Sequence, residues 1–249
     1  MRAHVRPCLS LLLVVAAGCG GSDRQAVEPD TTESRRLSPP AAGSRADCAP
    51  GVHVLRLGGG KRALMRVTAG SRARNALILV LHGAGGSSRD GLYAFRGGWK
   101  APDVVMLAPA AAGSTWSSLS GADVDLPTVD AALRRAFARC RIDRRRVAVG
   151  GFSDGATYAL SLGLANGGLF SAILALSPGG VVPQRYVGKP RVLVAHGIRD
   201  DVLPISRTSD AIVNALRGAG YAVTYRKFDG GHEAPAPISR AAVRWFLRA

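Results

Sequence analysis

The chain has 249 residues, of which 47% are hydrophobic and 20% charged, and this composition is typical of a globular protein. Its 33 lysines and arginines outnumber its 17 acidic residues and give a formal net charge of +16. No basic run reaches five residues, so we expect no specific nucleic-acid partner and interpret the densest basic cluster, residues 139–146, as part of a solvated face. The alternative is attraction to an anionic lipid or polymer.

The N-terminal residues have the pattern of a secretory signal. Arg2 and Arg6 precede an apolar run at 9–17 that is too short to span a bilayer. The run ends in AAGC, and small residues directly before a cysteine resemble the bacterial lipobox. We therefore predict a lipoprotein signal peptide at 1–18 and lipidation of Cys19, which would anchor the chain extracytoplasmically to the bacterial cell membrane through two or more acyl chains. The alternative is an ordinary signal peptide and a secreted protein.

The next segment, residues 19–47, is poor in large apolar side chains and rich in Pro, Ser, Gly and charge. Such a segment buries too little apolar surface to fold. We predict a flexible tether at 19–47 and a single folded domain at 48–249.

The domain alternates short apolar runs with stretches of helical period, which predicts an α/β fold with a mostly parallel sheet of about eight strands flanked by helices. The runs at 53–57 and 63–67 predict an antiparallel hairpin at one edge. Further strands are predicted at 76–81, 103–109, 146–152, 171–177, 191–197 and 222–228, and helices at about 126–139, 156–164, 206–217 and 238–247.

Two of the four cysteines are candidates for a disulfide. Cys8 leaves with the signal peptide and Cys19 would carry the lipid, so Cys48 and Cys140 remain. In an oxidising compartment an even remainder favours a bridge between them. The alternative is two independent buried thiols.

A candidate nucleophile lies in the sequence GGFSDGAT, where Ser153 stands in a Gly-x-Ser-x-Gly motif. The motif follows a predicted strand and precedes a predicted helix, which is the setting of a nucleophile elbow. Small neighbours are needed there because the turn is strained and the flanking backbones pass close together. The setting predicts a serine whose hydroxyl stands clear of the sheet.

A serine nucleophile needs a base, and the chain has five histidines. His4 is lost with the signal, His53 lies in the first strand, and His82 and His196 each end a strand before a glycine. His232 lies in a C-terminal loop after two glycines, which permit a tight path that turns its imidazole over the sheet. We predict His232 as the base; the alternative is a surface-loop histidine.

The base needs an acid that fixes its tautomer. Asp200 and Asp201 follow a strand at the carboxyl edge of the sheet, where the sites of open α/β sheets form. The order serine, aspartate, histidine matches the α/β-hydrolase arrangement. The residues alone leave both aspartates as candidates.

With these motifs the chain resembles the small serine carboxylesterase and phospholipase-like branch of the α/β-hydrolase superfamily. The resemblance runs from LHGAGGS (81–87) through GFSDGA (151–156) and HGIRDDVLP (196–204) to GGH (230–232). In that family the acid stands four residues after the histidine of His-Gly-x-x-Asp. The resemblance thus implies Asp200 as the acid, with Asp201 as a solvated or loop-capping neighbour.

The resemblance also implies an oxyanion hole, built from the backbone amides of Ala84 and Asp154. For LHGAGG the alternative is an ordinary glycine-rich strand end. Trp116 resembles a family residue that lines the substrate pocket, although it is equally compatible with a buried core tryptophan. Many thioesterase-like members carry glutamine where this chain has Asp154, so their depalmitoylating activity is not carried over.

These residues predict a serine esterase that cleaves a small-molecule or lipid-like carboxylic ester through an acyl-enzyme. No cofactor and no metal are expected, and the short stretch between Ser153 and Asp200 leaves no room for a large lid. The alternative within enzymes is a polyester depolymerase or feruloyl-esterase-like hydrolase. Alternatives from other classes are a non-catalytic envelope-binding lipoprotein and a binder of anionic polymers.

Overall fold

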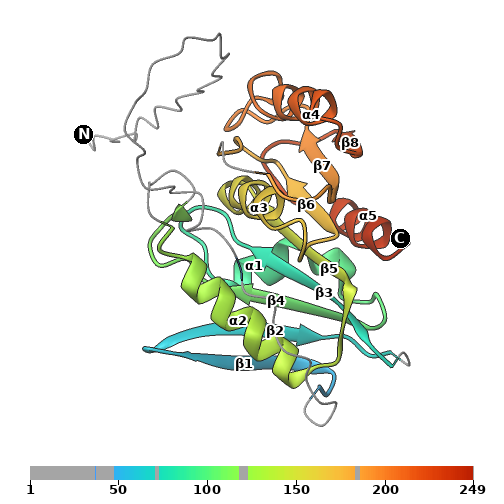
Figure 1. The fold of residues 1–249 in the computed structure, drawn as a ribbon. Helices are drawn as coiled ribbons and strands as arrows, with labels where there is room; N and C mark the ends of the chain where they lie inside the picture. Colours follow the sequence, from blue (N-terminus) through green and yellow to red (C-terminus); the bar gives the residue numbers. More distant parts are fainter. Residues whose placement is uncertain (1–36, 38–47, 71–72, 118–122, 183–185, 249) are drawn as a thin grey trace, which may run out of the picture. The chain divides into compact units, whose positions relative to one another are not determined.

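The computed structural model describes residues 37, 48–70, 73–117, 123–182 and 186–248. The predicted signal peptide, Cys19 and, apart from Leu37, the predicted tether lie outside the described residues. In the described part, eight strands form one sheet with the order β1-β2-β4-β3-β5-β6-β7-β8 (Figure 1). None of the helices in these ranges is long and apolar enough to cross a bilayer.

The sheet is mostly parallel, as the sequence predicts. Strands β1 and β2 form the expected antiparallel hairpin at one edge, β2 also pairs antiparallel with β4, and the remaining five pairs are parallel. The strands are β1 (Gly51–Gly58), β2 (Lys61–Val67), β3 (Asn75–Leu81), β4 (Val104–Pro109), β5 (Ile142–Phe152), β6 (Ala172–Leu176), β7 (Arg191–Gly197) and β8 (Val223–Phe228).

Helices cover both faces of the sheet (Figure 1). On one face α2 (Leu126–Arg139), α3 (Asp154–Ala165) and α4 (Ser209–Gly218) bury their apolar sides in the larger core cluster. On the other face α1 (Ser88–Ala94) and α5 (Ala236–Leu247) contribute to the second cluster. Two short 3-10 turns, η2 (Arg96–Gly98) and η4 (Ile205–Arg207), complete the described elements.

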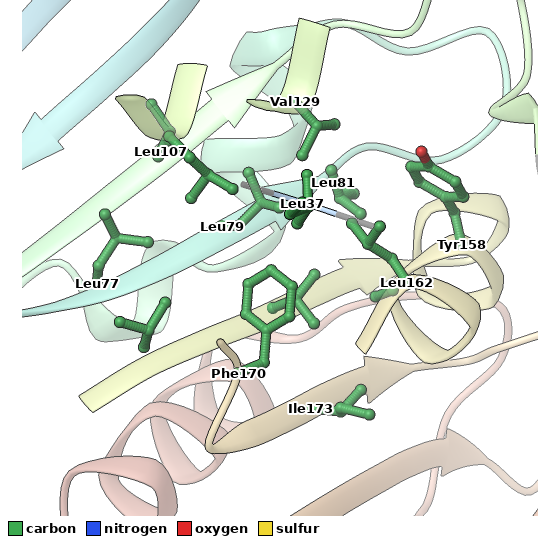
Figure 2. Packing of buried hydrophobic residues seen from close by; sticks show 14 of the residues in the cluster. Leu37, Leu77, Leu79, Leu81, Leu107, Val129, Tyr158, Leu162, Phe170 and Ile173 are labelled. Atoms are coloured by element: carbon green, nitrogen blue, oxygen red, sulfur yellow. The ribbon is translucent and has the colours of Figure 1, made fainter. Parts of the chain in front are cut away.

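Strands β3, β4 and β6 in the middle of the sheet carry long buried apolar runs because helices cover both of their faces. In β3, Leu77, Leu79 and Leu81 point into the larger cluster, while the alternate residues Ile78 and Val80 point into the second one. Figure 2 shows the three leucines among other side chains of the larger cluster. Because successive side chains of a strand point to opposite faces of the sheet, one continuous apolar run contributes to both core clusters.

Helix α1 was not predicted from the sequence. It has only seven residues, too few to show a helical period, and it is marked instead by a capping box in which Ser87 and Asp90 bond to each other. Strand β5 begins four residues earlier than predicted, and Arg144 and Arg145 in this extension are exposed. Exposure of these arginines agrees with the interpretation of the basic cluster as a solvated face.

Leu37 corrects the predicted tether at one point. Its side chain is buried in the same cluster as Leu79 and Leu81 (Figure 2), and its backbone N–H donates to Oδ1 of Asn166 at 2.8 Å. The sequence could not show this, because one leucine in a polar segment creates no apolar pattern. At Leu37 the segment is therefore packed on the domain rather than free.

A disulfide joins Cys48 and Cys140, which confirms the pairing favoured by the sequence. It ties the residues before β1 to the C-terminal cap of α2 across 92 positions of sequence. In the chain-entropy model, a bridge over so long a loop stabilises the fold by about 4 kcal/mol. The edge hairpin is thereby held to the helix that covers it.

Candidate active site

Ser153 occupies a strained turn between β5 and α3. Its φ of +57° and ψ of −120° lie in a region that residues other than glycine rarely adopt. The turn is held from below, because the Ser153 N–H donates to the carbonyl oxygen of Leu176 at 2.9 Å. It also needs Gly155, where an added Cβ would lie 2.4 Å from the carbonyl oxygen of His82. This geometry is that of the nucleophile elbow expected from the sequence.

His232 lies between Ser153 and Asp200. Its Nε2 is 2.8 Å from Oγ of Ser153, and its Nδ1 is 2.7 Å from Oδ2 of Asp200. Because a carboxylate only accepts, Nδ1 carries the proton and Nε2 is left to accept from the serine hydroxyl. The ring of Phe152 packs against the imidazole with centroids 4.9 Å apart. The structure thus brings together three side chains from positions far apart in the sequence.

The loop that carries His232 is held by its backbone. Nη1 of Arg96 donates to the carbonyl oxygen of Ala234 at 3.0 Å. The N–H of Arg199 donates to the carbonyl oxygen of Gly230 at 2.9 Å, and a Cβ at Gly197 would lie 2.3 Å from the carbonyl oxygen of Gly231. These close approaches fix the imidazole over the carboxyl ends of β5 and β7.

Asp200 is buried, whereas Asp201 is exposed. The Oδ1 atom of Asp200 accepts the backbone N–H groups of Val202 and Leu203 at 3.0 and 2.7 Å. Burial disfavours the charged carboxylate, but the hydrogen bonds from Leu203 and His232 outweigh it and hold the pKa of Asp200 below its ordinary value. Asp200 is therefore ionised beside His232 at neutral pH.

The glycine-rich loop after β3 lies against Ser153. A Cβ placed on Gly83 would be 3.4 Å from Cβ of Ser153, and Ala84 is exposed beside it. The N–H of Asp154 is the first of helix α3 and has no intrahelical acceptor. The two residues named from the resemblance, Ala84 and Asp154, thus belong to segments that lie next to the serine.

Trp116 is buried, with only 1% of its surface exposed. Its ring stacks on Tyr158 with centroids 5.3 Å apart, and its Nε1–H donates to the carbonyl oxygen of His82 at 2.8 Å. The expectation that Trp116 lines the substrate pocket is therefore corrected in favour of the alternative, a core tryptophan. Its size alone could not separate these two roles in the sequence.

Two further side chains support this edge and were missed by sequence reasoning. His82 donates from Nδ1 to the carbonyl oxygen of Gly83 at 2.8 Å and accepts the Ala111 N–H on Nε2 at 3.1 Å. Oδ2 of Asp154 accepts the Trp116 N–H at 2.8 Å, and burial raises the pKa of this carboxyl. Both link the loop after β4 to the vicinity of Ser153.

His196, which the sequence shows as a strand-end residue and as the histidine of the His-Gly-x-x-Asp motif, also contacts Asp200, with 2.9 Å between Nε2 and Oδ2. Within the described ranges, no group of three or more His, Cys, Asp or Glu side chains is arranged to hold a metal ion. The hydrogen bonds from Ser153 to His232 and from His232 to Asp200 allow a proton to move from Ser153 to His232 while Asp200 stabilises the resulting imidazolium.

Comparison with known proteins places this geometry in a family. The model of the phospholipase/carboxylesterase family matches residues 117–247, which include Ser153, Asp200 and His232. A probable feruloyl esterase C of Aspergillus terreus is 26% identical over 219 residues, which are 72% of this chain and 78% of that protein.

Solved structures show the same fold. The crystal structure of esterase PE8 is 27% identical with a TM-score of 0.62, over 74% of this chain and 96% of that one. The carboxylesterase of Bacillus cereus is 18% identical with a TM-score of 0.59, over 77% of this chain and 95% of that one. These matches confirm the α/β-hydrolase fold that the motifs predict.

Proposed function

The chain belongs to the phospholipase/carboxylesterase family and is a carboxylic ester hydrolase, and from this premise we propose that Ser153, His232 and Asp200 form its catalytic triad. The observation that carries the proposal is the pair of hydrogen bonds from Ser153 Oγ to His232 Nε2 and from His232 Nδ1 to Asp200 Oδ2. The strained φ of Ser153 supports it, because such strain is maintained at functional turns.

In the proposed reaction, Oγ of Ser153 attacks the ester carbonyl carbon while Nε2 of His232 takes the hydroxyl proton. The tetrahedral oxyanion is stabilised by the N–H groups of Ala84 and Asp154. The carbon–oxygen bond to the leaving group then breaks, and His232 returns the proton to the departing alkoxide. A water molecule activated by the same imidazole releases the acid from the acyl-enzyme.

We propose a small-molecule or lipid-like ester as the substrate. The similarity to a probable feruloyl esterase favours an aromatic acyl group as the second candidate. The non-catalytic alternative has less support, because all three side chains of the triad are present and bonded to one another. We also propose that the enzyme is anchored through Cys19 to the bacterial cell membrane, on its extracytoplasmic side.

Hydrolysis of p-nitrophenyl esters from acetyl to palmitoyl, together with a feruloyl ester, tests this proposal. Ser153→Ala and His232→Ala should each lower kcat by about 10⁴-fold or more, while Ser206→Ala, an exposed serine in η4, should leave it unchanged. A chain-length optimum identifies the acyl group. Undiminished hydrolysis by a folded Ser153→Ala variant would refute the triad.

A further inference from the structure

One carboxylate oxygen of Asp200 lies within hydrogen-bond distance of two imidazole rings. Its Oδ2 lies 2.7 Å from Nδ1 of His232 and 2.9 Å from Nε2 of His196. Its Oδ1 already accepts the backbone N–H groups of Val202 and Leu203. The carboxylate therefore receives four hydrogen bonds, and the two histidines share one of its oxygens.

The surroundings of His196 determine which ring nitrogen donates. Nε2 lies 2.9 Å from the carbonyl oxygen of Leu203 as well as from Asp200, and both of these groups only accept, so Nε2 carries a proton. Nδ1 is 2.6 Å from Oγ of Ser209, whose hydroxyl donates to it. Burial lowers the pKa of His196 against the opposing influence of Asp200, which keeps the ring neutral in this tautomer.

His196 connects three elements behind the proposed triad. It stands in β7, its Nε2 bonds to the loop that carries Asp200, and its Nδ1 meets Ser209, the first residue of α4. The side chains of His196 and Asp200 are both fully buried, so bulk solvent does not weaken their bond. His82 also ends a strand before a glycine, but its ring bonds to backbone groups of the neighbouring loops instead.

We propose that His196 is a positioning residue of the reaction. Its Nε2–H holds the carboxylate of Asp200 toward His232. As a second hydrogen-bond donor to Oδ2, it also makes His232 a weaker base than it would be beside Asp200 alone. This inference rests on the proposed function, since it concerns the acid and base of that mechanism. A second donor on Oδ2 draws part of the negative charge that would otherwise stabilise the His232 imidazolium. Loss of this donor should therefore make His232 a stronger base.

The other charged groups described around His232 lie nearer to solvent. Arg199 and Asp229 form an exposed ion pair, and Glu233 is exposed next to His232. Asp154, on the α3 side of Ser153, is partly exposed, and so is Arg96, whose guanidinium bonds to the carbonyl oxygen of Ala234. Solvent and salt screen such charges, so the buried hydrogen bond from His196 is the stronger influence on the pair.

The first experiment measures kcat/KM against pH for the full chain in detergent, with the ester that gives the highest activity. For His196→Leu, which removes the donor, we expect the acid limb to move to higher pH by about half a unit or more and kcat to fall about tenfold. His196→Gln, whose amide can still donate to Asp200, should restore the wild-type limb. Ser206→Ala is the control and should leave the acid limb unchanged, because this exposed serine of η4 is not part of the His196 contacts.

The sign of the shift separates this role from simple packing. An unmoved acid limb in a slower His196→Leu enzyme would show that His196 only fills space and would overturn the proposal. A shift to lower pH would also overturn it, because Asp200 would then have moved away from His232 and ceased to stabilise its imidazolium.

A second experiment observes the imidazole of His196 in the wild-type chain. Nitrogen-15 NMR of histidine-labelled wild-type chain should show His196, assigned by its absence in His196→Gln, with Nε2 protonated and Nδ1 unprotonated at neutral pH. The opposite tautomer would overturn the proposal even if His196→Leu fails to fold. Failure of the proposed function would appear differently, as esterase activity that survives Ser153→Ala while the tautomer of His196 stays as predicted.

Discussion

At the scale of single residues, the carboxylate of Asp154 has two opposite effects on the proposed site. It accepts the Trp116 N–H and so holds the loop after β4 in place. However, its own N–H is one of the two donors proposed for the oxyanion, and a negative side chain so near disfavours another negative charge. Burial raises the pKa of Asp154, which lessens this conflict by favouring the neutral acid. We therefore expect the site to depend more on the acceptor oxygen than on the charge of Asp154.

Two substitutions of Asp154 separate these contributions. Asp154→Asn keeps an acceptor for the Trp116 N–H and should retain kcat within about twofold. Asp154→Ala leaves that N–H without its acceptor and should lower kcat about tenfold and the free energy of unfolding by about 1–2 kcal/mol. Steady-state kinetics and urea unfolding of both variants measure these effects. Equal kcat for the two would show that the hydrogen bond does not matter to the reaction.

The residues of the site differ in how far the sequence reveals them. The strand, turn and helix around Ser153 and the glycines before His232 are local patterns, so both residues can be named from the sequence. The choice of Asp200 over Asp201 came from a resemblance, since adjacent aspartates look alike until one is buried. His82 and His196 share the pattern of strand end and glycine, yet only His196 bonds to Asp200. That difference arises from neighbours that are distant in sequence.

At the scale of elements, the turn between β5 and α3 is packed directly against the end of β3. A Cβ at Gly155 would lie 2.4 Å from the carbonyl oxygen of His82 and 2.5 Å from that of Leu81. Both are rigid backbone atoms, so α3 itself would have to move. Because the N-terminus of α3 supplies one proposed oxyanion donor, the same movement would displace that donor from the loop at Ala84.

Gly155→Ala should therefore harm both stability and catalysis. We expect a loss of about 2–3 kcal/mol in the free energy of unfolding and a fall in kcat of about 100-fold, measured by urea unfolding and ester hydrolysis. Gly168→Ala is the control, because this exposed glycine has no atom within 4 Å of its added Cβ. A Gly155→Ala enzyme as stable and active as Gly168→Ala would show that the close packing can relax.

Most elements follow from their periodicity. All eight strands and helices α2 to α5 were predicted, with ends that differ by a few residues, because most of them bury enough apolar surface to leave a pattern. Helix α1 leaves none, since only Gly91, Leu92 and Ala94 of its seven residues are buried. Its position depends on close packing, as a Cβ on Gly91 would lie 2.9 Å from the carbonyl oxygen of Val80. Contacts of this kind are not encoded in local hydrophobic spacing.

At the scale of the whole molecule, composition predicted one folded domain but overstated the freedom of the segment before it. Leu37 packs into the core cluster and bonds to Asn166, so the length of chain between Cys19 and the domain is shorter than composition implied. The excess of basic residues gives a net charge of +16, which could also hold the protein at an anionic membrane without any lipid. These two modes of membrane attachment respond differently to salt.

Substitution of Cys19 separates a lipid anchor from electrostatic attraction. In a bacterial host, we expect the wild-type chain to stay in the membrane fraction after a wash in about 1 M salt, where the Debye length is only about 3 Å, and to incorporate labelled fatty acid. Cys19→Ser should lose both properties, because the proposed attachment depends on two or more acyl chains carried by this cysteine. Cys8→Ser lies within the predicted signal peptide and serves as the matched control, which should remain anchored. Release of the wild-type chain by salt alone, without incorporated fatty acid, would instead assign its membrane attachment to the basic surface.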